Sequence, residues 1–344
     1  MFKKTNILAL IVAAAVSAFS APGAASERPK AGSDRAEITQ HQSPVLWRYP
    51  SDIRSRNLFY GPGGQADAPH TVYTFVKEDL HGTNPKFVVR DEGGVKWKVK
   101  LGSEARPETA ASRMVWAVGY STNEDYFVPE LKVEGMPAHL KRGQNLVEPG
   151  GVVRNARLKR YVEGQKKTGD WQWRANSFSP RELNGLRVMM ALINSWDLTD
   201  RNNSTYEEKG VASSGDAGET AMVSDLGASF GTTGRNSREK KGNLGAFEHS
   251  KFITKVTPSY VDFATPSRPM LLYVFSLPEF VMRVRLRWIG KRVPRSDARW
   301  MGQLLAQLSP VQIADAFRAA GYSPSEVDGF TKVVRERISE LEKL

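Results

Sequence analysis

Two acidic segments of the chain carry side chains that can hold a divalent cation and orient a hydroxyl group. The first contains Asp197 and, five residues later, Asn202. The second contains Asp225, which begins an Asp-Leu-Gly sequence. Phosphoryl transfer requires a carboxylate that orients the acceptor, and an amide and a second carboxylate that hold the magnesium ion on the nucleotide phosphates. We therefore predict that Asp197 is catalytic and that Asn202 and Asp225 bind metal.

The first segment contains a second pair with the same chemistry. If the register shifts, Asp200 replaces Asp197 as the catalytic carboxylate and Asn203 replaces Asn202 as the metal ligand. Asp and Asn are also common in turns, because their side chains bond to nearby backbone groups. A plain loop without chemistry is therefore the alternative interpretation of residues 197–203.

Three β-rich runs precede these segments and are separated by turn sequences that contain glycine. This pattern predicts three antiparallel strands. In the third run apolar residues alternate with lysines, so the apolar side chains point to one face and the lysines to the other. The runs are residues 71–76, 86–90 and 95–101.

Helical patterns follow the strands. A helix is predicted over residues 106–119, because proline stands near its start and Gly119 ends it. Glu108 lies in its first turn, where a carboxylate complements the helix dipole. Three further helices are predicted over residues 179–196, 309–321 and 323–344.

The order of the acidic residues resembles that of atypical kinases of the phosphoinositide-kinase and HipA type. In kinases an Asp is followed five residues later by Asn, and then by an apolar run that ends in Asp-x-Gly. The resemblance covers roughly residues 73–231, and Ser195-Trp196 stand where protein kinases have His-Arg.

The resemblance implies a nucleotide site. Lys100 would bind the nucleotide phosphates, with Lys98 as a second candidate, and Glu108 would pair with Lys100. The loop His81–Asn84 would cover the phosphates. The implied cofactor is ATP with Mg²⁺ or Mn²⁺, and the implied activity is that of a phosphotransferase whose acceptor is unidentified.

A strand-rich first half and a helical second half predict an α+β architecture. With the resemblance, this becomes a two-lobed kinase-like fold. The expected divisions are a signal peptide at 1–25, a tail and lead-in segment at 26–60, an N-lobe with a small antiparallel sheet at 61–150, and a mainly helical C-lobe at 151–344.

Two other functions compete with catalysis by a kinase. One is a non-catalytic kinase-like protein that binds a nucleotide, a phosphorylated ligand or another protein. The other is a secreted serine hydrolase, because residues 227–231 read Gly-Ala-Ser-Phe-Gly and match the nucleophile-elbow pattern with Ser229 as the nucleophile. An elbow must open a helix, whereas a basic polar stretch follows here.

The N-terminus has the layout of a secretory signal peptide. Lys3 and Lys4 precede an apolar run at residues 7–19, and small residues follow at 21–25. The chain contains no cysteine, so no disulfide stabilises the exported protein. These features predict a periplasmic or secreted protein.

The chain is basic, with a formal net charge of +12, which favours anionic partners. Residues 283–295 are dense in arginine and contain Trp288, a composition that suits an anionic surface or a half-buried helix or strand with a solvated arginine face. Export argues against nucleic acid as the partner. The oligomeric state is not indicated by the sequence.

If the signal peptide is cleaved near Ala25, the mature protein will begin close to Ser26 and will occur in the periplasmic or extracellular fraction. N-terminal sequencing of fractionated cells measures this directly. A full-length species that stays in the membrane fraction at high salt would show instead that residues 7–19 are an anchor.

Overall fold

The three strands expected from the alternating pattern are present. The computed structural model contains β1 (Tyr73–Asp79), β2 (Lys86–Asp91) and β3 (Lys96–Lys100), and β2 pairs antiparallel with both neighbours. Trp97 and Val99 are buried on one face of β3, as predicted. The structure describes residues 43–82, 84–208, 219–232, 241–264, 281 and 284–344.

These strands belong to a larger, mixed sheet. β5 (Asp125–Glu134), β6 (Val147–Glu148) and β7 (Val152–Arg160) extend it to the order β3-β2-β1-β5-β7-β6. A pairing of β3 with β7 joins five of the strands into a closed ring. The expectation of a purely antiparallel sheet was wrong, because β1 and β5 run parallel and are connected through a helix. The expected lobe boundary at residue 150 falls between β6 and β7, which pair with each other.

The interior of the strand ring is a separate apolar core. Alternate residues of each strand point inward, and the largest buried side chain among them is Trp97. The indole nitrogen of Trp97 donates to Asp91 at 2.9 Å, so its polar atom is satisfied inside this core. The lysines of β3 lie on its outer face.

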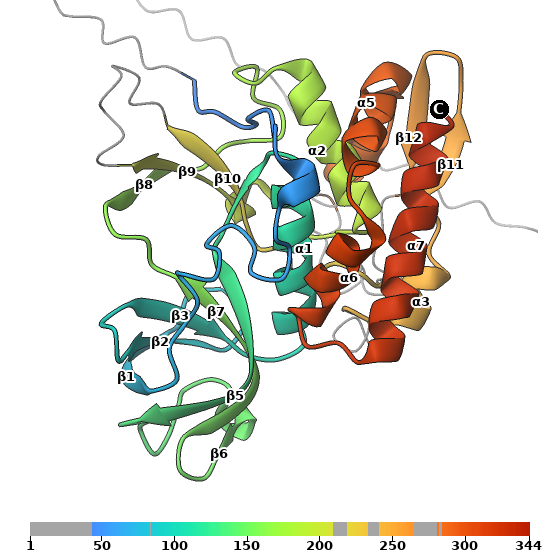
Figure 1. Ribbon diagram of the computed structural model, residues 1–344. Helices are drawn as coiled ribbons and strands as arrows, with labels where there is room; N and C mark the ends of the chain where they lie inside the picture. Colours follow the sequence, from blue (N-terminus) through green and yellow to red (C-terminus); the bar gives the residue numbers. More distant parts are fainter. Residues whose placement is uncertain (1–42, 83, 209–218, 233–240, 265–280, 282–283) are drawn as a thin grey trace, which may run out of the picture. The chain divides into compact units, whose positions relative to one another are not determined.

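Helix α1 (Ala105–Ala117) lies between the strand ring and the helices of the second half, and it confirms the predicted helix (Figure 1). It contacts β5 and β7 on one side and α6 on the other. Ala110, Ala111, Met114 and Val115 pack into the large core of the second half. Small and apolar residues allow this helix to be buried on two sides.

Outside the strand ring the chain forms helices and two small sheets, so the described residues form a mixed α/β structure (Figure 1). One sheet has the strand order β4-β10-β9-β8, and the other has the order β11-β12-β13. The helices are α2 (Pro180–Leu192), α3 (Leu244–Glu248), α5 (Arg295–Leu305), α6 (Pro310–Arg318) and α7 (Pro324–Glu342). The strands are β4 (Ser121–Thr122), β8 (Gln165–Gly169), β9 (Asn203–Glu208), β10 (Thr220–Val223), β11 (Ile253–Val256), β12 (Tyr260–Phe263) and β13 (Val293–Pro294).

The two C-terminal helices begin where the sequence predicted. Ser309 and Ser323 each form a capping box with the residue three positions on, and proline follows each serine at the first helical position. α2 likewise begins at the predicted Ser-Pro step but ends at Leu192, before Trp196. The shorter helix leaves residues 193–199 free to form the loop of the first acidic segment.

The described part of the arginine-rich segment, residues 284–295, leads into α5, a helix that was not predicted from the sequence. Arg285 and Arg287 are exposed, whereas Trp288 packs against the core and lies 5.1 Å from the guanidinium of Arg187. The signal-peptide residues 1–25 lie outside the described residues. Among the described helices, none is both long and apolar enough to cross a membrane.

Five aromatic rings hold α6 and α7 to the segment that follows Asp225. Phe330 of α7 stacks on Phe317 of α6 at 4.8 Å and contacts Phe230, Phe247 and Tyr322 edge-on or tilted. Phe330 is fully buried. The cluster therefore connects the C-terminal helices to the candidate site.

Replacement of Phe330 by alanine should lower the free energy of unfolding by about 3–5 kcal/mol, because it removes buried contacts and leaves a cavity. Val311→Ala on α6 is the control, since Val311 is 62% exposed and its loss should change stability by less than about 0.5 kcal/mol. Urea unfolding measures both. A Phe330→Ala loss no larger than that of the control would contradict the packing described here.

Candidate functional site

Lys100 lies at the centre of the candidate site. It is the last residue of β3, and its side chain is only 5% exposed. Its Nζ atom lies 2.9 Å from Glu104 Oε2, 2.7 Å from Glu108 Oε2 and 2.7 Å from Asp225 Oδ1. Burial alone would lower the pKa of Lys100, but the charges of Glu108, Asp225 and Glu104 outweigh burial and raise it. Lys100 is therefore a fully charged ammonium.

Helix α1 supplies two of the three carboxylates. Glu104 is its N-cap residue and Glu108 lies in its first turn, so the two side chains are four positions apart on one face. The expected pair of Lys100 with Glu108 is present. Glu104 was missed, because the helix was predicted to begin at residue 106, one residue after its start at Ala105, and the four-residue spacing of the two glutamates was not used.

Arg157 fixes Glu108 from the opposite side. It lies on β7, where its Cα is the direct partner of Lys100 in the β3–β7 pairing. Its Nη2 atom lies 2.9 Å from Glu108 Oε1, and its Nη1 atom lies 3.2 Å from Asp125 Oδ1. The side chains of Lys100, Glu108, Asp125 and Arg157 are all buried. Glu108 is thus held between two cations and keeps a fixed position.

Glu104 connects three further parts of the chain. Asn84, from the loop between β1 and β2, donates to Glu104 Oε2 at 2.6 Å. Lys241, which follows the Asp-Leu-Gly segment, pairs with the other oxygen. Gly227 packs so closely that a Cβ there would lie 2.6 Å from Glu104 Cβ. Burial would raise the pKa of Glu104, but Lys100 and Lys241 lower it to about 2.

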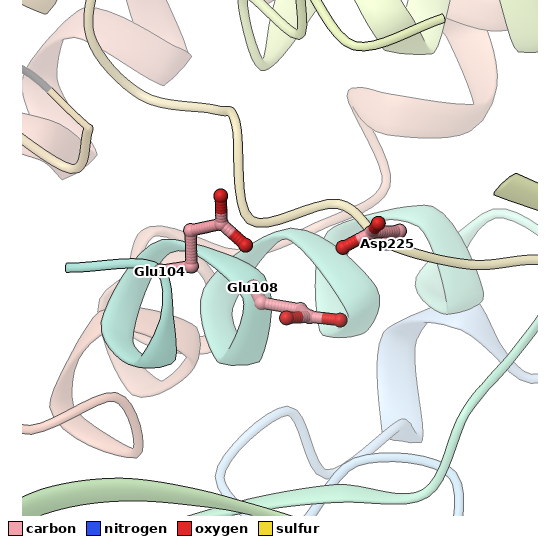
Figure 2. A group of neighbouring side chains, drawn as sticks. All are labelled: Glu104, Glu108 and Asp225. Atoms are coloured by element: carbon pink, nitrogen blue, oxygen red, sulfur yellow. The ribbon is translucent and has the colours of Figure 1, made fainter. Parts of the chain in front are cut away.

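The carboxylates of Glu104, Glu108 and Asp225 form an acidic cluster (Figure 2). One oxygen of each lies within 4.8 Å of the others. The Asp225 side chain is 42% exposed, whereas those of Glu104 and Glu108 are almost completely buried. Asp225 has a left-handed backbone with φ of +54°, a conformation that Asp tolerates better than most residues. Asp225 is therefore the member of the cluster that faces solvent.

The two acidic segments lie side by side. Asn203 pairs with Val223 across β9 and β10, two residues before Asp225. Beyond Asp225, the amide of Trp196 donates to Ala228 O at 3.2 Å, and the amide of Phe230 donates to Ile193 O at 2.8 Å. The segments thus run antiparallel and are bonded on both sides of Asp225. This places the loop of Asp197 next to the acidic cluster.

The predicted residues of the first segment differ in their partners. Asn202 Nδ2 donates to the backbone oxygen of Asp197 at 3.0 Å, which closes the loop. Asp200 Oδ1 accepts from the amide of Trp173 at 3.0 Å, so this carboxylate has a structural partner. Asn203 is buried, and its Nδ2 has no hydrogen-bond partner within the described residues. The expected roles of these residues remain predictions.

Two further lysines share the outer face of the strand ring. Lys86 is the direct partner of Lys100 in the β2–β3 pairing, and Lys98 lies two residues before Lys100. Lys98 pairs with Asp79 at 2.9 Å. Burial and the neighbouring lysines lower the pKa of Lys86, against the charge of Asp79. Lys86 was missed, although its position at the start of the second predicted strand placed it opposite Lys100.

The nucleophile elbow expected for a hydrolase has no accessible nucleophile. Ser229 is fully buried, and its Oγ has no partner among the described residues. Among the residues that the structure describes, the next helix is α3, which begins at Leu244. The only downstream histidine, His249, bonds through Nδ1 to the backbone oxygen of Gly245 at 2.6 Å. These positions do not support acyl transfer by Ser229.

No protein-family model and no curated protein matches the chain. Among solved structures, the Helicobacter pylori proinflammatory kinase CtkA is similar with a TM-score of 0.44 and 8% identity, over 80% of this chain and 98% of CtkA. The Golgi casein kinase with Mn/ADP bound has a TM-score of 0.36 and 9% identity, over 80% of this chain and 73% of its own. A second Golgi casein kinase structure has a TM-score of 0.31 and 10% identity, over 80% of this chain and 74% of its own.

The low pKa of Glu104 makes stability depend on pH. Because the pKa falls from 4.5 in the unfolded chain to about 2 in the fold, Glu104 contributes stability above pH 4.5 that is lost as the pH falls towards 2. We expect this contribution to be about 3 kcal/mol. In Glu104→Gln the difference in unfolding free energy between pH 6 and pH 2 should shrink by this amount, as measured by urea unfolding. An unchanged pH dependence would contradict the ion pairs of Glu104.

Proposed function

We propose that this chain is a kinase-like phosphotransferase that uses ATP and a divalent metal ion. The observation that carries the proposal is the contact of one buried lysine with Glu108 of α1 and with Asp225 of the Asp-Leu-Gly segment. A phosphate-binding lysine, a helix glutamate that positions it and a metal-binding aspartate are the parts that phosphoryl transfer requires. The proposal includes a two-lobed arrangement, with the strand ring and α1 as one lobe.

The nucleotide phosphates are proposed to lie against the outer face of β2 and β3. Lys86, Lys98 and Lys100 share this face. The charges of Lys98 and Lys100 contribute to lowering the pKa of Lys86, so the three ammonium groups repel one another. A bound triphosphate would relieve this repulsion. Lys100 is the central contact, and Glu108 with Arg157 keeps it in place.

The charges around Lys100 fit a further cation. The connected ion pairs contain three cations, Lys100, Arg157 and Lys241, and four carboxylates. This leaves one excess negative charge, and Asp225 is the most exposed of the carboxylates on Lys100. Carboxylate and amide oxygens are the ligands that Mg²⁺ and Mn²⁺ prefer. Asp225 and Asn202 would hold the ion, with Asn203 as the alternative amide, and the ion would neutralise charge on the phosphates.

Asp197 is proposed to orient the acceptor hydroxyl. In the transfer, a bond forms from the acceptor oxygen to the γ-phosphorus as the bond to the ADP oxygen breaks, and the hydroxyl proton passes to the Asp197 carboxylate. The loop of Asp197 is held by the Asn202 side chain and by the backbone bonds on both sides of Asp225. Asp200 is the alternative catalytic carboxylate, and one of its oxygens accepts from the backbone amide of Trp173.

A non-catalytic nucleotide-binding protein is the second candidate. Three carboxylates already accept hydrogen bonds from the Lys100 ammonium, so nucleotide phosphates must compete with them for these bonds. Ser195-Trp196 also replace the His-Arg that precedes the catalytic aspartate of protein kinases. The proposal includes export, which the signal-peptide pattern of residues 1–25 supports, and leaves the acceptor class open.

ATP with Mn²⁺ or Mg²⁺ should raise the melting temperature of the mature chain, because a ligand selective for the native state stabilises it. Asp225→Asn should abolish the shift, since the metal loses a charged ligand. Asp328→Asn, at an exposed position of α7, is the matched control and should keep the full shift. If neither ATP nor GTP shifts the melting temperature with either metal, the nucleotide site is refuted.

Asp197→Asn separates an enzyme from a binding protein. The change preserves shape but removes the proton acceptor, so ATP affinity should stay within about twofold while phosphoryl transfer falls about 100-fold or more. Transfer from labelled ATP is measured against protein, lipid, sugar and small-molecule acceptors. A wild-type chain that binds ATP but transfers to no acceptor, and does not hydrolyse ATP, would favour the non-catalytic candidate.

A further inference from the structure

A basic three-stranded sheet lies beside α5, away from the strand ring (Figure 1). β11 and β12 form its hairpin, and β13 pairs with the other edge of β12. The segments that contain this sheet, residues 251–264 and 284–295, hold seven lysines and arginines but a single acidic residue, Asp262. The seven cations are Lys251, Lys255, Arg285, Arg287, Lys291, Arg292 and Arg295. The proposed nucleotide site uses none of them.

One face of the sheet is turned outward. Val261 and Phe263 of β12 are buried in the core, so Tyr260 and Asp262, which alternate with them, point to the opposite face. Lys255 is the direct cross-strand partner of Asp262 and therefore shares this face. The outer face of the hairpin thus carries a tyrosine, a lysine and one carboxylate.

Three cations gather on this sheet around Tyr260. Lys255 and Arg292 are exposed and lie 5.5 Å and 5.3 Å from the centroid of the Tyr260 ring. The Nζ atom of Lys291 donates to a threonine hydroxyl of β11 at 3.4 Å. Asp262 Oδ1 accepts from the backbone amide of Arg292 at 2.7 Å, and none of the three cationic side chains forms an ion pair with a carboxylate of the described residues. One carboxylate against three cations leaves this face positive.

The end of the hairpin adds exposed apolar surface. Val256, the last residue of β11, is 49% exposed, and Pro258 in the turn is exposed as well. Lys255 and Tyr260 stand next to this end on β11 and β12. Lysine, arginine and tyrosine each combine an apolar body with a polar tip, which suits the boundary between lipid headgroups and acyl chains. The same combination of cations and apolar side chains attaches amphipathic helices to anionic bilayers.

We propose that the sheet of β11, β12 and β13 docks on the headgroups of an anionic lipid bilayer. Phosphodiester headgroups would meet Lys255, Lys291 and Arg292, and Val256 would enter the headgroup region. A bilayer fits this surface better than an acidic protein does, because mobile headgroups can pair with cations spread over a sheet while the bilayer also takes up the apolar end of the hairpin. This inference does not depend on the proposed function.

The test is flotation of the mature chain, which lacks residues 1–25, with vesicles of phosphatidylcholine that contain about one third phosphatidylglycerol. The chain should float with these vesicles and not with vesicles of pure phosphatidylcholine. Binding should be lost as salt rises from about 0.1 M to about 1 M, because the Debye length falls from about 10 Å to about 3 Å. Absence of binding to the anionic vesicles, equal binding to both kinds, or binding that persists at high salt overturns the proposal.

A double variant locates the binding surface. Lys255→Gln with Arg292→Gln should weaken the affinity for anionic vesicles about 30-fold, or about fivefold for each charge removed. The matched control is Lys132→Gln with Lys166→Gln, which removes two exposed lysines from β5 and β8 and should change the affinity by less than about twofold. An equal loss in both double variants would show attraction by net charge alone and would overturn the assignment to this sheet.

Val256→Ser tests the apolar end of the hairpin separately. This change should weaken binding several-fold and leave its salt dependence unchanged, because it removes apolar surface and no charge. Val311→Ser, at a 62% exposed position of α6, is the control and should bind as the wild type does. An unchanged affinity in Val256→Ser would show that charge alone is recognised, as by an acidic protein, and would overturn docking on a bilayer.

Discussion

The ammonium group of Lys100 and the carboxylates around it are the interaction on which the candidate site depends. Taking a lysine out of water costs several kcal/mol unless its charge is matched by good hydrogen bonds. Here Glu104, Glu108 and Asp225 each accept one bond at 2.7–2.9 Å. These acids come from the N-cap and first turn of α1 and from the segment after β10. One side chain thus fixes the strand ring, α1 and the Asp-Leu-Gly segment in a single arrangement.

The packing around this network explains why it keeps its geometry. α1 is buried between the strand ring and the C-terminal helices, so the backbone that carries Glu104 and Glu108 is fixed by packing on two sides. Gly227 brings the Asp-Leu-Gly segment against Glu104 at a distance that no larger residue permits. The aromatic cluster of Phe230, Phe317 and Phe330 holds the same segment to α6 and α7. Asp225 is therefore positioned from both sides while its carboxylate remains open to solvent.

The parts of the site that depend on local sequence could be predicted, and the parts that depend on distant pairing could not. Period-two alternation placed Lys98 and Lys100 on one face, and the pattern of the next helix placed Glu108 in its first turn. Arg157 was missed because the first lobe was ended at residue 150, whereas the ring closes through β7. No local pattern indicates that Lys241 reaches Glu104, which lies 137 positions earlier. Long-range ring closure likewise made the sheet mixed instead of antiparallel.

The most direct measurement is a crystal structure of the mature chain with Mn²⁺ and a non-hydrolysable ATP analogue. Mn²⁺ should give anomalous density on the Asp225 carboxylate, and a nucleotide phosphate should lie within hydrogen-bond distance of Lys100 Nζ. Glu108 should keep its contacts with Lys100 and Arg157. A nucleotide bound elsewhere, with Lys100 still enclosed by Glu104, Glu108 and Asp225 and no Mn²⁺ on Asp225, would contradict the proposed nucleotide site.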